Sequence, residues 1–163
     1  EKSVYRPWKE LDLGAFAFKS IHVADMNGDK RPDLLLVGPG KLGILYAGQS
    51  DPRLKTIANY ETALEDVHFT DLAVGDLNGD DLPDVAVIDT KSQYVDILNY
   101  MPGAGLRHAV HFKVFEAKSF SDDKEGGSEP REIVISDVTG DGRADLILLS
   151  HDRVLLYPQD AGR

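Results

Sequence analysis

One nine-residue pattern occurs three times in this chain and constrains its fold more than any other feature. The copies begin at Asp25, Asp76 and Asp137 and share the frame Asp-x-Asn/Thr-Gly-Asp-x-x-x-Asp. Because Asp and Gly each fill roughly 6 to 7% of an ordinary sequence, four fixed matches arise by chance on the order of once in 10⁵ windows. Three copies in 163 residues therefore indicate an internally repeated fold.

Each copy lies between two segments with the apolar patterns of β-strands. Apolar residues stand four and two positions before each opening Asp: Ile21 and Val23, Leu72 and Val74, Ile133 and Ile135. Unbroken apolar runs follow the closing Asp at residues 34–37, 85–88 and 146–149. Alternation predicts a strand with one buried face, and a short continuous run rich in β-formers predicts a strand buried on both faces.

Two further strands complete the predicted unit. Turn signals at residues 38–40, 90–92 and 150–152 precede third strands around residues 44–46, 95–98 and 154–157. A more polar fourth strand is expected before each unit, near residues 5–11, 54–60 and 111–115. Residues 119–128 read as an exposed polar loop inserted before the third copy.

Repeats of this length with four antiparallel strands predict an all-β fold, a β-propeller of which this chain supplies three blades. We expect one domain over residues 1–163, with units of approximately 1–50, 51–102 and 103–160. Propellers close with about four to eight blades. The remaining blades would come from a longer parent chain, a second copy or a partner chain, and the absence of an initiator Met favours a processed or excised segment.

The repeated loop has the composition of a site for a hard cation. In a tight loop, the side chains at positions 1, 3, 5 and 9 and the backbone carbonyl at position 7 can converge as oxygen ligands. The predicted ligands are Asp25, Asn27, Asp29, Arg31 and Asp33; Asp76, Asn78, Asp80, Leu82 and Asp84; and Asp137, Thr139, Asp141, Arg143 and Asp145. Up to three Ca²⁺ ions are expected, because an irregular all-protein cage suits Ca²⁺ better than Mg²⁺.

Local features of the loop separate this prediction from its rivals. Gly28, Gly79 and Gly140 at position 4 are expected to take a positive φ and fold the loop inward. Asp, Asn and Gly are also ordinary turn residues, but a plain hairpin gives no reason for the further Asp at position 9. An EF-hand is excluded because position 12, where it needs a bidentate Glu, falls inside an apolar strand. Thr139 is a poorer ligand than Asn, so the third site is the weakest.

The overall composition excludes several classes of partner. The formal net charge of −10 argues against nucleic acid and anionic membrane surfaces, which need a positive field. The chain has no Cys, so disulfides and Cys-ligated zinc are not available. No apolar run reaches the length of about 18 residues that a membrane span requires, and membrane insertion is not expected.

No catalytic constellation is evident, and we do not expect an enzyme. The five His residues are scattered, and His108 and His111 stand three apart on a predicted strand, which would place them on opposite faces. Asp122 and Asp123 read as part of a solvated loop. The aromatic residues read mainly as packing, since three tyrosines recur at the ends of third strands; the residues concerned are Trp8, Tyr46, Tyr100 and Tyr157.

The three loops D-M-N-G-D-K-R-P-D, D-L-N-G-D-D-L-P-D and D-V-T-G-D-G-R-A-D, with their flanking strands, resemble FG-GAP/VCBS repeats. These repeats are related to the calcium-binding blades of integrin α-subunit propellers, and the resemblance covers nearly the whole chain. It implies that the Asp and Asn residues of the loops are calcium ligands and that the setting is extracellular, periplasmic or cell-surface. The Phe-Gly and Gly-Ala-Pro landmarks are missing, so the resemblance does not imply integrin-type ligand binding.

The resulting expectation is a secreted or cell-surface, calcium-stabilised scaffold for protein recognition or adhesion, whose ligand is a protein or a glycan. One alternative is a carbohydrate-binding accessory module, which exposed aromatic residues around Trp8 would support. Another is part of a propeller-type polysaccharide-degrading enzyme, which would bring His, Lys, Arg and Tyr together in one cleft. A fold alone does not decide between these functions.

Overall fold

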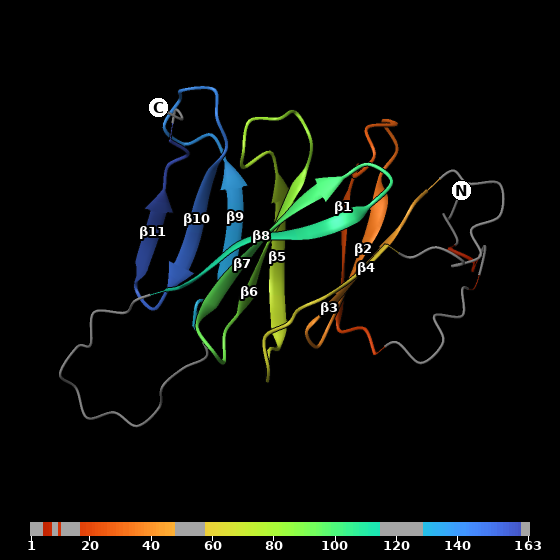
Figure 1. The fold of residues 1–163 in the computed structure, drawn as a ribbon, viewed down its shortest axis with the longest axis horizontal. Coiled ribbons are helices and arrows are strands. Elements are labelled where there is room, and N and C mark those ends of the chain that lie inside the picture. The colour runs from red at the N-terminus through yellow and green to blue at the C-terminus, as the bar shows by residue number, and fades with distance from the viewer. Residues whose placement is uncertain (1–4, 8–9, 11–16, 48–57, 115–128, 161–163) are drawn as a thin grey trace.

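The computed structural model describes residues 5–7, 10, 17–47, 58–114 and 129–160, which fold into three antiparallel β-sheets (Figure 1). The first sheet contains β1 (Ser20–Ala24), β2 (Asp33–Gly38), β3 (Lys41–Leu45) and β4 (Ala58–Glu61). The second contains β5 (Phe69–Gly75), β6 (Asp84–Asp89), β7 (Tyr94–Met101) and β8 (Gly105–Lys113). The third contains β9 (Glu132–Ser136), β10 (Asp145–Ser150) and β11 (Arg153–Tyr157). The all-β prediction is confirmed, and the described residues include no helix.

The strands follow one another in each sheet in chain order, so strands that are neighbours in a sheet are also consecutive in the chain. Strands β4 and β8 overlap the polar strands expected at the start of the second and third units. They pair with β3 and β7, so each completes the sheet of the preceding unit. The strand expected near residues 5–11 falls largely outside the described residues, and the insertion at residues 119–128 does so entirely.

The second sheet lies between two hydrophobic clusters. Val85 and Val87 of β6 belong to the cluster shared with the first sheet, whereas Ala86 and Ile88 belong to the cluster shared with the third sheet. Successive side chains of a strand point to opposite faces. The continuous apolar run of β6 is therefore explained by burial on both faces, as the sequence predicted, and all six residues of the strand are buried.

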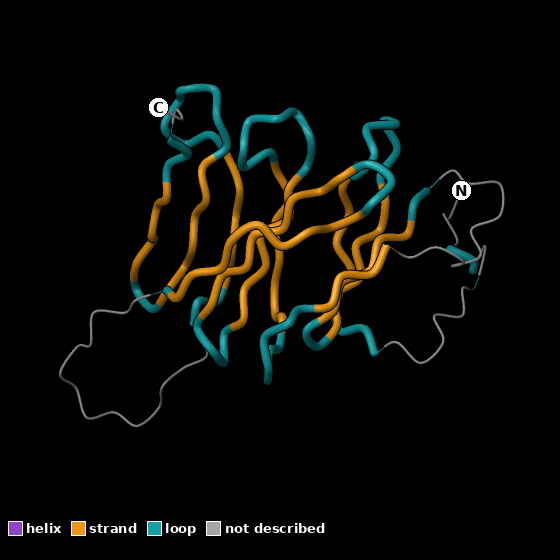
Figure 2. The backbone as a smooth tube through the Cα atoms, viewed as in Figure 1, coloured by secondary structure: helices purple, strands orange, loops and turns teal. Residues whose placement is uncertain are grey.

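The first strands of the three sheets lie side by side. Asp71 of β5 lies 3.8 Å from Nε2 of His22 on β1, and its other oxygen accepts a hydrogen bond of 3.4 Å from the backbone N–H of Ile133 on β9. Gly75 of β5 leaves room for Ile135, whose side chain would overlap any Cβ added at position 75. This alignment places the hairpins that follow β1, β5 and β9 along one edge of the molecule (Figures 1 and 2).

The two end sheets present apolar side chains to solvent. On the third sheet, Val134, Val154 and Leu156 are 43%, 68% and 45% exposed, and on the first sheet Ile21 and Val23 are 59% and 63% exposed. The sheets of the described residues do not close into a ring. Within the same residues, no helix has the length and hydropathy needed to cross a membrane.

Candidate functional site

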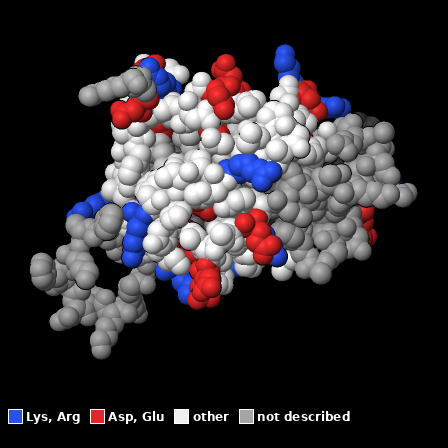
Figure 3. Space-filling model, viewed as in Figure 1, with Lys and Arg blue, Asp and Glu red and all other residues white. Residues whose placement is uncertain are grey.

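The three repeated loops form the hairpins β1–β2, β5–β6 and β9–β10 at one edge of the structure. Acidic side chains gather at this edge in separate groups, one at each hairpin (Figure 3). The sequence-predicted ligands of each loop are therefore brought together within that loop. The loops are not pooled into one shared site.

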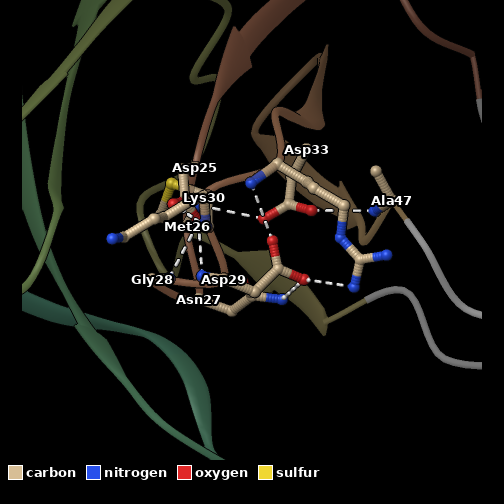
Figure 4. A network of polar contacts seen from close by, with 9 residues as sticks. Asp25, Met26, Asn27, Gly28, Asp29, Lys30, Asp33 and Ala47 are labelled. Carbon is tan, nitrogen blue, oxygen red and sulfur yellow. Dashed lines mark hydrogen bonds and ion pairs between the residues drawn. The ribbon is translucent and has the colours of Figure 1, made fainter.

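The first Asp of each loop organises the backbone that follows it. In the first loop, Asp25 accepts hydrogen bonds from the backbone N–H groups of Gly28 at 2.8 Å and Lys30 at 2.7 Å (Figure 4). Asp76 accepts equivalent bonds from Gly79 at 2.6 Å and Asp81 at 2.9 Å, and Asp137 from Gly140 at 2.7 Å and Gly142 at 2.9 Å. Position 1 thus draws the amides of positions 4 and 6 around one carboxylate.

Two positions of each loop adopt left-handed backbone conformations. The predicted positive φ at position 4 is confirmed, with values of 74°, 78° and 77° at Gly28, Gly79 and Gly140. Position 6 is left-handed as well, which the sequence reasoning missed, with 64° at Lys30, 63° at Asp81 and 85° at Gly142. Only the third loop has at position 6 the residue type that adopts this conformation without strain.

The last Asp of each loop is completely buried and ties the loop to the body of its sheet. Asp33, Asp84 and Asp145 are each 0% exposed. Asp33 accepts hydrogen bonds from the backbone N–H of Met26 at 2.9 Å and of Ala47 at 2.8 Å. Asp84 accepts from Leu77 at 2.9 Å, and Asp145 accepts from Val138 at 3.0 Å and Gln159 at 3.2 Å. A carboxylate has about four lone-pair positions, so these oxygens retain capacity for another ligand.

The loops differ in how the carboxylate at position 5 is balanced. The guanidinium of Arg31 lies 3.1 Å from Asp29, and that of Arg143 lies 3.2 Å from Asp141. The hydrogen bond from the Arg31 side chain lowers the pKa of Asp29 below the ordinary value for Asp. In the second loop, the residue at position 7, where the other two loops have these Arg residues, is Leu82, which carries no charge.

The second loop therefore holds the most concentrated negative charge. Burial raises the pKa of Asp84 from 3.8 to about 6, and the charges of Asp80 and Asp76 act in the same direction. A fourth carboxylate, Asp81, stands beside these residues in the chain. A cation that bound here would meet little competition from a neighbouring guanidinium.

The donor chemistry of all three loops fits a hard cation. The side chains at positions 1, 3, 5 and 9 offer carboxylate, amide or hydroxyl oxygens, and none offers the nitrogen or sulfur that transition metals favour. At position 3, the side-chain oxygens of Asn27 and Asn78 accept the backbone N–H of Asp29 at 3.0 Å and of Asp80 at 2.9 Å. The carboxylates are here turned towards loop amides, so a cation would replace part of these contacts.

Comparison with known proteins agrees with this geometry. Residues 12–87 match the family model of the FG-GAP-like repeat. This segment is similar to an FG-GAP-like repeat. The match includes the first two hairpin loops, so the resemblance inferred from their motifs is confirmed there, and the third loop lies beyond it. No curated protein matches the chain.

Away from the hairpin loops, the structure corrects one prediction. His108 and His111 do not lie on opposite faces of their strand, because β8 contains a β-bulge. His108 pairs with Leu98 and Val110 pairs with Ile97, so Ala109 is an extra residue between them. An extra residue shifts the alternation of side chains by one position, and the two His side chains share a face.

The three tyrosines Tyr46, Tyr100 and Tyr157 are engaged in packing. The hydroxyls of Tyr46 and Tyr100 lie 3.0 Å apart in a hydrogen bond between the first and second sheets. Tyr157 packs against Phe112 with ring centroids 5.4 Å apart. Trp8, Asp122 and Asp123 lie outside the described residues.

Proposed function

We propose that the chain is a calcium-binding β-propeller module in which each sheet is a blade and each repeated hairpin holds one Ca²⁺. It acts as an extracellular or cell-surface scaffold for protein recognition or adhesion. The observation that carries this proposal is a completely buried carboxylate at the same position of three hairpins on one edge of the molecule. A buried carboxylate is costly unless it is paired or coordinates a metal.

In this proposal calcium stabilises the fold through the loops. Two unit charges about 4 Å apart interact by about 4 kcal/mol at an effective dielectric constant near 20, so several carboxylates in one loop oppose its closure. A cation that binds the folded loop and not the unfolded chain adds about 2.7 kcal/mol of stability per site at a hundred times its Kd. The ligands would be the side chains at positions 1, 3, 5 and 9 of each loop and the carbonyl groups of Arg31, Leu82 and Arg143.

The loops should differ in affinity. The second loop binds most tightly in this proposal, because Asp80 faces no guanidinium and its Asn78 supplies an amide oxygen. The first loop follows, since Arg31 already pairs with Asp29. The third loop is weakest, because Arg143 pairs with Asp141 and position 3 is Thr139.

The scaffold role is supported by the form of the sheets. The end sheets expose apolar side chains of β1, β9 and β11, which further blades would cover. These blades belong to the same parent chain, to a second copy or to a partner chain. The recognised ligand, a protein or a glycan, would contact the variable loops, since a rigid scaffold commonly carries its binding residues there.

Titration of Ca²⁺ into metal-free protein, followed by calorimetry, tests the calcium sites. We expect heat of binding and a higher melting temperature in Ca²⁺ than in EDTA. Asp80→Asn should weaken the tightest site, whereas Asp81→Asn removes the same charge from a neighbouring position that is not a ligand and should weaken it much less. An identical melting temperature in Ca²⁺ and EDTA would contradict the proposal.

A further inference from the structure

Asp96, His108 and His111 converge on one face of the second sheet, away from the hairpin loops. Within the described part of the chain, they are the group of three ligand-type side chains whose ligand atoms all lie within 4.8 Å of one another. Asp96 lies on β7 directly opposite His111 on β8, and the bulge at Ala109 turns His108 to the same face. The bulge is therefore what assembles the group.

The carboxylate in this group lacks a hydrogen-bond partner on one oxygen. Asp96 is 3% exposed, and its Oδ1 is buried without a hydrogen bond, although Nε2 of His108 lies 3.2 Å away. Its Oδ2 accepts a hydrogen bond of 3.3 Å from the hydroxyl of Tyr60 on β4. A buried acceptor without a partner costs about 1–3 kcal/mol, and more when it is charged. A positive ligand for Oδ1 would remove this cost.

The spacing of the ligand atoms fits one small metal ion. Nε2 of His108 lies 3.2 Å from Nδ1 of His111 and 3.2 Å from Oδ1 of Asp96. Ligand atoms about 2.0–2.1 Å from a tetrahedral zinc ion lie about 3.3–3.4 Å apart. Two ring nitrogens that face each other at this distance can both direct lone pairs at an ion between them, with their protons on the outer nitrogens.

We propose that Asp96, His108 and His111 form a binding site for a divalent transition metal, with Zn²⁺ as the fitting ion. Two imidazoles and one carboxylate suit Zn²⁺ and its neighbours and do not suit Ca²⁺ or Mg²⁺, which take oxygen ligands. Both His side chains are exposed, so the site opens to solvent and water would complete the tetrahedron. The site is independent of the hairpin loops and of calcium.

Surrounding residues hold two of the three ligands in place. The Tyr60 hydroxyl donates a hydrogen bond of 3.3 Å to Oδ2 and so orients the carboxylate of Asp96. The ring of Tyr94 packs edge-on against His111, with centroids 5.8 Å apart and an interplanar angle of 69°. Hydrogen-bonded and packed outer groups of this kind are typical of metal sites.

The test is isothermal titration of ZnCl₂ into tag-free protein that has been stripped with EDTA, dialysed and saturated with Ca²⁺. Saturation keeps the oxygen-rich loops occupied, so they do not contribute heat. We expect one Zn²⁺ per chain and at least a tenfold loss of affinity in His108→Gln and in His111→Gln, because outer groups alone are worth about 10–100-fold. Both side chains are exposed, so neither change should disturb folding.

His68→Gln is the matched control, because His68 is outside the group and its Nδ1 lies 2.9 Å from the carbonyl oxygen of Asp66. It should bind Zn²⁺ as the unaltered chain does. The proposal is overturned if the unaltered chain binds no Zn²⁺, or if all three variants bind it equally well. In either case, the group would be an Asp–His ion pair without a metal.

Discussion

The buried carboxylate of the second loop provides the sharpest test of the charge argument. Asp84 is 0% exposed, and its pKa is raised from 3.8 to about 6, chiefly by burial. A folded-state pKa above the unfolded value means that ionisation opposes folding, so this cost is absent below about pH 4 and complete above about pH 6. At 1.36 kcal/mol per pH unit, it amounts to about 3 kcal/mol at neutral pH.

Asp84→Asn removes the charge and keeps the shape. The Asn carbonyl oxygen can still accept the hydrogen bond from the backbone N–H of Leu77. The NH₂ group of Asn takes the place of the acceptor Oδ1, however, and this exchange should lower the free energy of unfolding by about 1 kcal/mol. In EDTA at pH 7, the variant should therefore be about 2 kcal/mol more stable than the unaltered chain. With saturating Ca²⁺ the order should reverse if Asp84 is the calcium ligand proposed above, because the variant would lack that ligand.

Urea unfolding at pH 4, 5, 6 and 7, with EDTA or with Ca²⁺, measures these differences. The stability advantage of Asp84→Asn in EDTA should appear as the pH rises from about 4 to 6 and should be absent at pH 4. Asp81→Asn removes an exposed charge from the same loop and serves as the control, with little change at any pH. If Asp84→Asn were less stable than the unaltered chain in EDTA at pH 7, the reasoning would be refuted.

Two further predictions concern backbone conformation and packing. Gly142→Ala should lower the stability of the fold by about 1–2 kcal/mol, because the φ of Gly142 is 85°, and this cost is conformational since an added Cβ would meet no atom within 4 Å. Lys30→Gly, at a φ of 64°, should raise the stability by about 0.5–1 kcal/mol. Thermal melts of both variants check these opposite signs. Gly75→Ala should cost about 1–3 kcal/mol by overlap with Ile135, and Ile135→Ala should remove most of this penalty. A double-mutant cycle without coupling would show that β5 and β9 do not pack as described.

Much of the fold could be predicted because local patterns and burial agree. The alternation at Leu72 and Val74 became β5 with both side chains turned to the core, and the continuous run at residues 85–88 became the doubly buried strand β6. The same alternation at Ile21 and Val23 became β1, but there it is the apolar side chains that are exposed. The positive φ at position 4 of the loops was predictable as well, because Gly is the residue that adopts a positive φ without strain. These features depend on side-chain periodicity and turn chemistry, which a single sequence displays directly.

The features that escaped prediction have different physical origins. The bulge at Ala109 is a feature of the pairing of β7 with β8, and the alternation of polar and apolar residues along one strand does not reveal it. The left-handed conformation of Lys30 and Asp81 was also missed, because the three loops share no residue type at position 6 and Lys seldom adopts this conformation. The ion pair of Arg31 with Asp29 was missed because position 7 was considered only for its carbonyl group.

If both proposed sites bind their ions, the bulge and the hairpins separate two kinds of metal chemistry within one chain. At the hairpin edge, the side chains at positions 1, 3, 5 and 9 of each loop offer only oxygen donors. On the face of the second sheet, one unpaired residue aligns two imidazoles with a buried carboxylate from the neighbouring strand. Because hard cations select the first donor set and borderline transition metals the second, occupancy of either site should leave the other unaffected. A Zn²⁺ affinity that fell as Ca²⁺ was raised would instead mean that both ions compete for the loops.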